Sequence, residues 1–249
     1  MIGTYVVCRR LVFLSGGITH ASFGGIGMAY YFGANPLLGA LLFAVLSALG
    51  IETFTARKQI REDSAIGLLW SLGMAIGIIF IYLTPGYAPN LMSFLFGNIL
   101  SVTGTDIFWM GVVDLAILLI FGTMYHPILF VAFDREYARS QNFPTRTISY
   151  LMATLVAVTI VISIRVVGIV LLISLLTIPA VIGNLISKSF GRILLYGSVI
   201  AALSAFAGLY ISYQTNIPSG ASTIFVLTVT LIAVKTITFV RLKRRMKTR

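Results

Sequence analysis

The sequence predicts an all-α fold, a polytopic transmembrane helical bundle of about eight spans. Of its 249 residues, 58% are hydrophobic and only 10% are charged, whereas soluble domains carry about 25% charged residues. Apolar runs long enough to cross about 30 Å of hydrocarbon recur along the whole chain. These runs are continuous and do not alternate with a period of two, which excludes a β-barrel.

Helix-breaking residues separate the predicted spans. The breakers include Asn35-Pro36, Pro85-Gly86, Pro144 and Pro218-Ser219-Gly220, which are typical of turns. The predicted spans lie at about 17–34, 37–54, 64–84, 106–124, 147–164, 166–186, 193–213 and 222–240. Between residues 17 and 240, the chain therefore consists of predicted spans and the loops that join them.

Lys and Arg are distributed unevenly over the connecting loops. They follow the second, fourth, sixth and eighth predicted spans, whereas loops 34–36, 85–105 and 214–221 contain neither residue. Because cytoplasmic loops retain Lys and Arg, this distribution predicts a cytoplasmic C-terminus with a basic tail at 241–249. The predicted location is the plasma membrane, which is the inner membrane in bacteria. The net charge of +11 is thereby explained without a nucleic-acid partner.

Catalytic motifs are absent from the sequence. It contains no phosphate-binding loop of the form GxxxxGKS or GxxxxGKT, and no HExxH, GxSxG or CxxC motif. The seven acidic residues offer few pairs for acid–base chemistry, and the single Cys8 allows no internal disulfide. We therefore expect a non-enzymatic chain with no catalytic residue and no bound cofactor.

Two predicted loops are long enough to carry a function. The outer loop 85–105 contains an apolar stretch at 91–100 that is too short to span a membrane, so we expect it to be interfacial or re-entrant. The inner loop 125–146 contains a short amphipathic stretch that suits docking of another protein. An ordinary solvated connector is the alternative for this inner loop.

Four stretches, in order along the chain, carry a resemblance to a known family. They are RRLVFLSGGITHASFGGIG (9–27), SFLFGNILSVTGTDI (93–107), FDREYARSQNF (133–143) and NIPSGASTIFV (216–226). Together they resemble the permease subunits of ABC importers for metal ions (zinc, manganese or iron), of the ABC-3 type, over essentially the whole chain. Relatives begin with another helix, and residues 1–16 resemble the end of that helix and an inner loop.

The resemblance implies a type II ABC importer-like permease that forms the translocation path as a homodimer. It also implies a cytoplasmic ATPase subunit, which would bind and hydrolyse ATP, and an extracytoplasmic metal-binding protein that delivers the ion. The divalent metal would be a transported substrate and not a cofactor. Residues 1–249 would form a single permease domain in the lipid bilayer, with 125–146 as the cytoplasmic coupling segment.

The resemblance assigns the ATPase contact to a short part of that coupling segment. The residues expected to make the contact are Phe133, Asp134, Arg135, Glu136, Tyr137, Ala138, Arg139 and Asn142. We expect a short helix seated in a groove of the ATPase, so that ATP-driven closure moves the permease between outward and inward states. Relatives usually have glycine at the position of Asn142, and Asn tolerates the same left-handed backbone conformation.

His20 is the main candidate for contact with the metal. Imidazole is a suitable ligand for zinc, manganese and iron, and the surrounding glycines permit close approach between helices. Family members commonly carry an acidic residue four positions earlier, where this chain has Gly16, so we expect a weak, transient contact on the path. The alternative is a histidine that hydrogen-bonds a neighbouring helix.

Asp114 and Asn98 are two further candidates for contact with the metal. Asp114 lies in the middle of a predicted span, where it could coordinate the ion, but we favour a structural ion pair with Lys235 or Arg165. Asn98 stands in the outer-loop motif at a position where many relatives have Asp.

Two other transporter classes stay open. An ABC permease for a metal chelate, such as a siderophore or a cobalamin-like cofactor, would share the coupling segment, although such relatives are longer. A stand-alone secondary transporter would show inverted repeats, interrupted helices and several intramembrane acids, of which only Asp114 is clear here. The metal itself stays open, because zinc, manganese and ferrous iron share ligand types.

Overall fold

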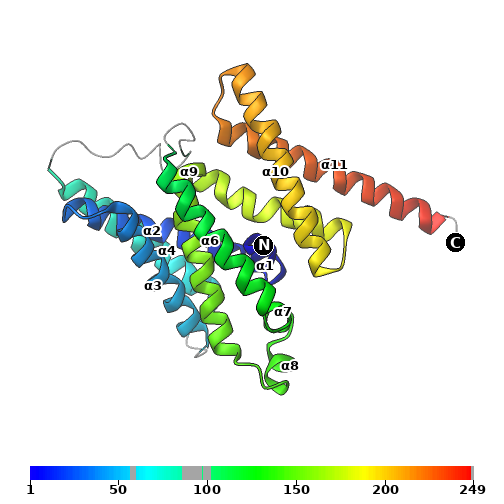
Figure 1. Cartoon of the computed structure of the whole chain (residues 1–249), viewed down its shortest axis with the longest axis horizontal. Coiled ribbons are helices and arrows are strands. Elements are labelled where there is room, and N and C mark those ends of the chain that lie inside the picture. Colours follow the sequence, from blue (N-terminus) through cyan, green and yellow to red (C-terminus); the bar gives the residue numbers. More distant parts are fainter. Residues whose placement is uncertain (57–59, 86–96, 98–101, 248–249) are drawn as a thin grey trace. The chain divides into compact units, whose positions relative to one another are not determined.

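The computed structural model contains helices and no strands over the residues it describes, which are 1–56, 60–85, 97 and 102–247 (Figure 1). The helices are α1 (Ile2–Cys8), α2 (Val12–Tyr31), α3 (Pro36–Ala56), α4 (Glu62–Leu83), α6 (Gly104–Thr123), α7 (Tyr125–Phe133), α8 (Arg135–Ser140), α9 (Thr145–Ile186), α10 (Phe190–Thr215) and α11 (Ser219–Lys247). The all-α prediction is confirmed. The predicted re-entrant stretch 91–100, apart from Gly97, lies outside the described residues.

The chain forms two compact units. One comprises Cys8–Ile169 together with Ile2, and contains helices α2 to α8 and the first part of α9. The other comprises Val170–Arg249 together with Met1 and Gly3–Val7, and contains the rest of α9, α10 and α11. The single permease domain predicted for the whole chain stays a prediction.

Six of the described helices are long and apolar enough to cross a membrane, so the expectation of about eight spans is too high. The six are α3, α4, α6, α9, α10 and the part Ser219–Val240 of α11. One difference is α9, whose 42 residues contain two of the predicted spans. The other is α2, predicted as the first span, which is not among the six because its Gly, Ser, Thr and His residues lower its hydropathy.

A kink inside α9 stands where the sequence predicts a turn between two spans. Gly168 has φ 76° and ψ 165° there, a non-helical conformation that favours glycine. A proline inside a helix commonly kinks it, but Pro179 lies within α9 and is not the non-helical residue. Gly97 of the outer loop approaches this kink so closely that an added Cβ would lie 2.5 Å from the backbone nitrogen of Gly168. Gly97 therefore packs against the kink.

Glycines bring α2 into backbone contact with α3 and α4. A Cβ added at Gly24 would lie 2.8 Å from the carbonyl oxygen of Gly73 in α4. A Cβ added at Gly25 would lie 2.5 Å from the carbonyl carbon of Gly39 in α3. The predicted close approach between helices is therefore confirmed, and most residues of α2 are buried. Small residues serve this role in membrane bundles because they let helix backbones meet.

The second unit is built on the pair α10 and α11. Asn216 ends α10 in the left-handed conformation, with φ 55°, and the chain then turns into α11. Gly208 of α10 packs against the backbone of Thr223 in α11. In the same unit, Gly3 of α1 faces the backbone of Leu176 in α9, so glycine contacts hold helices together here as well.

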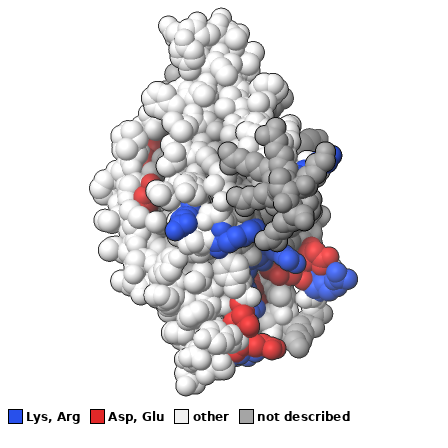
Figure 2. Space-filling view, turned by 90° about the vertical axis from the view of Figure 1, so that its right-hand side faces the viewer, with Lys and Arg blue, Asp and Glu red and all other residues white. Residues whose placement is uncertain are grey.

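Apolar side chains cover much of the molecular surface. Large exposed examples include Phe108, Leu203, Phe206 and Phe225. Figure 2 shows one face on which most of the surface is uncharged, and Lys, Arg, Asp and Glu are confined to a few clusters. Such a surface suits contact with hydrocarbon and would be a liability in water.

Candidate functional site

His20 lies on α2 and stacks on the ring of Trp70 in α4. The ring centroids are 4.3 Å apart and the planes differ by 6°. Stacking occupies a face of the imidazole and leaves its two nitrogens, which lie at the ring edge, available to a ligand. Within the part of the chain that the structure describes, His20 makes no side-chain hydrogen bond. The interhelical hydrogen bond considered as its alternative role is therefore not observed.

Gly16, one helical turn before His20, faces the same tryptophan. A Cβ added at Gly16 would lie 3.8 Å from the Trp70 ring, which is an ordinary van der Waals contact. Trp70 thus covers the position where relatives carry an acidic side chain. Over the described residues, no group of three or more His, Cys, Asp or Glu side chains could hold a metal. His20 therefore offers a single ligand.

Asp114 is exposed on α6 and forms no ion pair among the described residues. Arg165 pairs instead with Asp106, at 2.9 Å. Of the two predicted partners of Asp114, Arg165 is therefore wrong, because it lies beside the first turn of α6 and not beside its middle. The pair with Lys235, which belongs to the other compact unit, stays a prediction. Asn98 lies outside the described residues.

Asp106 is a structural residue that the sequence analysis missed. Its carboxylate accepts hydrogen bonds from the backbone N–H of Thr103 at 2.9 Å and from the Thr103 hydroxyl at 2.7 Å. The Thr103 hydroxyl accepts in turn from the backbone N–H of Asp106, which completes a capping box at the start of α6. The sequence signal was present, since an acidic residue three positions after a threonine precedes an apolar run.

Residues 125–146, the predicted coupling segment, contain two short helices, α7 and α8, so the predicted short helix is confirmed. Asp134 is the N-cap of α8, and its carboxylate accepts from the backbone N–H groups of Glu136 and Tyr137 at 3.0 and 2.9 Å. Asn142, just after α8, has φ 58°, which confirms the predicted left-handed conformation. Phe133 and Tyr137 are exposed. This segment therefore presents aromatic side chains at its surface.

Arg135, the first residue of α8, turns toward the bundle. Its guanidinium forms an ion pair with Glu52 of α3 and donates to the Ser149 hydroxyl of α9 at 2.5 Å. Arg9, which precedes α2, lies 3.9 Å from the same carboxylate, measured from Nη2 to Oε2. We call Glu52, Arg9, Arg135 and Ser149 the Glu52 network.

Glu52 was missed by the sequence analysis. Only 8% of this residue is exposed, and a buried carboxylate requires a charged or hydrogen-bonding partner. The signal in the sequence is one acidic residue inside the apolar run ALGIETF. Its partners could not be found in the same way, because they are distant in the chain.

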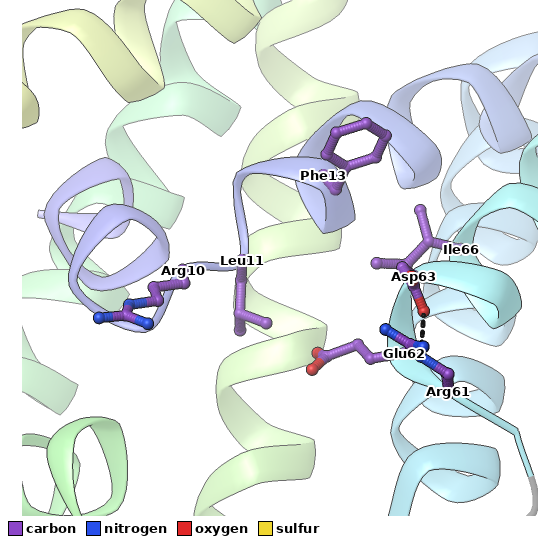
Figure 3. Close-up of a pocket in the computed structure, with 7 residues that line it drawn as sticks. All are labelled: Arg10, Leu11, Phe13, Arg61, Glu62, Asp63 and Ile66. Carbon is purple, nitrogen blue, oxygen red and sulfur yellow. Dashed lines mark ion pairs between the residues drawn. The ribbon is translucent and has the colours of Figure 1, made fainter.

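A cavity of about 470 Å³ lies at the N-terminal ends of α2 and α4 (Figure 3). Its lining residues are Arg10, Leu11, Phe13, Arg61, Glu62, Asp63 and Ile66. Arg61 and Asp63 form an exposed ion pair at 3.5 Å, and the Glu62 side chain extends toward Leu11 (Figure 3). Basic and acidic side chains are mixed here, so the cavity favours neither anions nor cations strongly.

Known proteins are similar in sequence to this chain over most of its length. Residues 1–238 match the ABC 3 transport family. A probable metal transport system membrane protein of Chlamydia pneumoniae is 37% identical over 226 residues, which cover 88% of this chain and 77% of that protein. The manganese transport system membrane protein MntC of Halalkalibacterium halodurans is 33% identical over 226 residues, which cover 91% of this chain and 77% of that protein.

A solved structure shares the fold. PsaBC from Streptococcus pneumoniae, in complex with Fab, matches with a TM-score of 0.81 and 28% identity, over 94% of this chain and 84% of that chain. The ABC permease fold expected from the resemblance is confirmed. With six helices suited to crossing a membrane, the chain is a multi-pass membrane protein, and it belongs to the ABC 3 transport family.

Proposed function

We propose that this chain is the permease subunit of an ATP-driven importer of divalent metal ions, and that two copies form the translocation path. The likeness to PsaBC over 94% of the chain is the observation that supports this most. A relative is named as a manganese transport protein, which supports manganese as the first candidate ion, before zinc and ferrous iron. Hydrolysis of ATP would fall to a separate subunit.

His20 is proposed to contact the ion in transit. Its ring face is held by Trp70, so the imidazole is oriented without a side-chain hydrogen bond among the described residues. One neutral imidazole is a weak ligand compared with a closed site of several donors. Weak binding suits a conduit, because the ion must also leave. Asp114 and Asn98 are secondary candidates for this contact.

Two partner proteins are proposed, one on each side of the membrane. The segment formed by α7 and α8, with exposed Phe133 and Tyr137, is proposed to seat in a groove of a cytoplasmic ATPase. The basic tail at 241–249 is proposed to lie on the same cytoplasmic side. An extracytoplasmic metal-binding protein would deliver the ion on the opposite side.

Uptake of labelled manganese, zinc and ferrous iron, in cells with and without this gene, tests the proposal. Deletion is expected to reduce uptake of one metal to background. His20→Ala is expected to reduce it as well, while the protein stays in the membrane. Trp109→Ala is the control, because Trp109 is exposed on α6 and belongs neither to the candidate metal contact nor to the segment proposed to meet the ATPase.

Other outcomes would change the assignment. Unchanged uptake of all three ions would contradict the proposal and favour a permease for a metal chelate. Normal uptake in His20→Ala, with loss in the deletion strain, would keep the transport function and remove His20 from the path.

A further inference from the structure

The Glu52 network joins four separate parts of the first compact unit. Glu52 lies near the end of α3, Arg9 precedes α2, Arg135 begins α8, and Ser149 lies in the first turns of α9. The neighbouring residue adds a second link, since the hydroxyl groups of Thr53 and Tyr150 are 2.9 Å apart. The end of α3 is therefore fastened both to the coupling segment and to α9.

Burial distinguishes this network from ordinary surface ion pairs. The exposed fractions of the Glu52, Arg9 and Arg135 side chains are 10%, 12% and 31%, whereas those of the Arg61–Asp63 pair are 86% and 65%. An exposed pair contributes little because water and salt screen it. A buried pair holds its partners together, because separating them leaves an unpaired charge away from water. Displacing Arg135 should therefore displace Glu52 with it.

Glu52 sits in the same packed block as His20. Backbone contacts at Gly24 and Gly73 join α2 to α4, and contacts at Gly25 and Gly39 join α2 to α3. The stack of His20 on Trp70 lies inside this block. Close-packed interiors transmit displacement and do not deform continuously. A displacement at the end of α3 should therefore reach the helix that carries His20.

We propose that Glu52 is a positioning residue through which the coupling segment moves the helix that carries His20. This inference rests on the proposed function, in which an ATPase displaces α8. Arg135 then carries the displacement to the Glu52 carboxylate, and Glu52 passes it to α3 and, through Arg9, to the start of α2. Glu52 touches neither the ion nor the ATPase in this scheme.

The test is the number of labelled Mn²⁺ ions transported per ATP hydrolysed, by the permease reconstituted with its ATPase and binding protein. Glu52→Gln keeps the shape of the side chain and removes its charge. We expect this ratio to fall about tenfold, within the range typical of coupling between two sites, while the complex still assembles and hydrolyses ATP. A purely structural role would lower the amount of folded complex and leave the ratio unchanged.

Two further variants supply matched comparisons. Asp63→Asn removes the exposed pair on the neighbouring helix, and its ratio is expected to equal that of the wild type. Arg135→Gln is expected to match Glu52→Gln, and the double variant is expected to fall no further, because the two residues act as one unit. A normal ratio in assembled Glu52→Gln complexes, or additive losses in the double variant, would overturn the proposal.

The remaining outcomes are also decisive. Should Glu52→Gln not accumulate in the membrane, Arg135→Lys takes its place, since lysine keeps the charge but loses the planar fork that contacts Glu52 and Ser149 together. A normal ratio in Arg135→Lys would then refute the inference. A wild-type complex that transports no Mn²⁺ would refute the proposed function instead, so the two failures are distinguishable.

Discussion

Helices α2 and α6 are equal in length and differ in burial and hydropathy. Most of the 20 residues of α2 are buried, although it is too polar to count among the candidate spans. Of the 20 residues of α6, only Ile117 and Phe121 are buried, although its composition is clearly apolar. In this pair of helices, the more apolar helix is the more exposed one. The helix that carries the candidate site is therefore one that falls outside the candidate spans because of its polar residues.

The glycines of the two helices should give the largest contrast. Gly25→Leu on α2 would drive a side chain into the backbone of Gly39, and we expect it to cost about 3 kcal/mol of unfolding free energy or more, the upper end of overpacking effects. Gly111→Leu on α6 is the matched variant, because a Cβ there meets nothing within 4 Å. Thermal unfolding of the purified proteins measures both. Equal losses would contradict the contrast between an enclosed and an open helix.

The two tryptophans give the next contrast. Trp70→Ala removes the ring that holds His20, and we expect a loss of about 1 kcal/mol from the missing ring contact, together with reduced manganese uptake. Trp109→Ala on α6 removes an exposed ring that meets only Phe108 edge-on among the ring contacts of the described residues, so uptake should be unchanged. Normal uptake in Trp70→Ala would mean that His20 needs no orientation by its neighbour.

The two aspartates of α6 give a third contrast, between a carboxylate that caps the helix and one that is exposed without an ion pair among the described residues. Asp106→Ala removes a capping box and the partner of Arg165, and we expect it to lower the unfolding free energy by about 1 kcal/mol. Asp114→Ala removes an exposed carboxylate without an ion pair in the described structure, so no loss of stability is expected. Unfolding in detergent and metal uptake should be measured for both. Loss of uptake in Asp114→Ala alone would place Asp114 on the path.

The helices could be predicted from the sequence, whereas the kink in α9 and the pairing of Arg135 with Glu52 could not. Apolar runs predict the helices, because a helix in hydrocarbon needs a continuous apolar surface. They do not reveal that Gly168 kinks α9 where a turn was expected, since the glycine is conspicuous only through its backbone conformation. The short helix α8 was predictable from local capping, whereas its link to Glu52 depends on residues more than eighty positions apart. Pairing across that distance leaves no local pattern.

Cys8 should show the smallest effect. It tests whether the residues just before α2 are shielded from water. Burial raises the pKa of the Cys8 thiol, so a smaller fraction is thiolate at neutral pH than for free cysteine. Because the thiolate is the nucleophile, reaction with a water-soluble maleimide should be modestly slower than for free cysteine at pH 7. The rate should also rise to its plateau at higher pH, since a raised pKa delays ionisation. A pH profile identical to that of free cysteine would mean that water reaches this end of α2, and that the enclosure of the helix begins only beyond it.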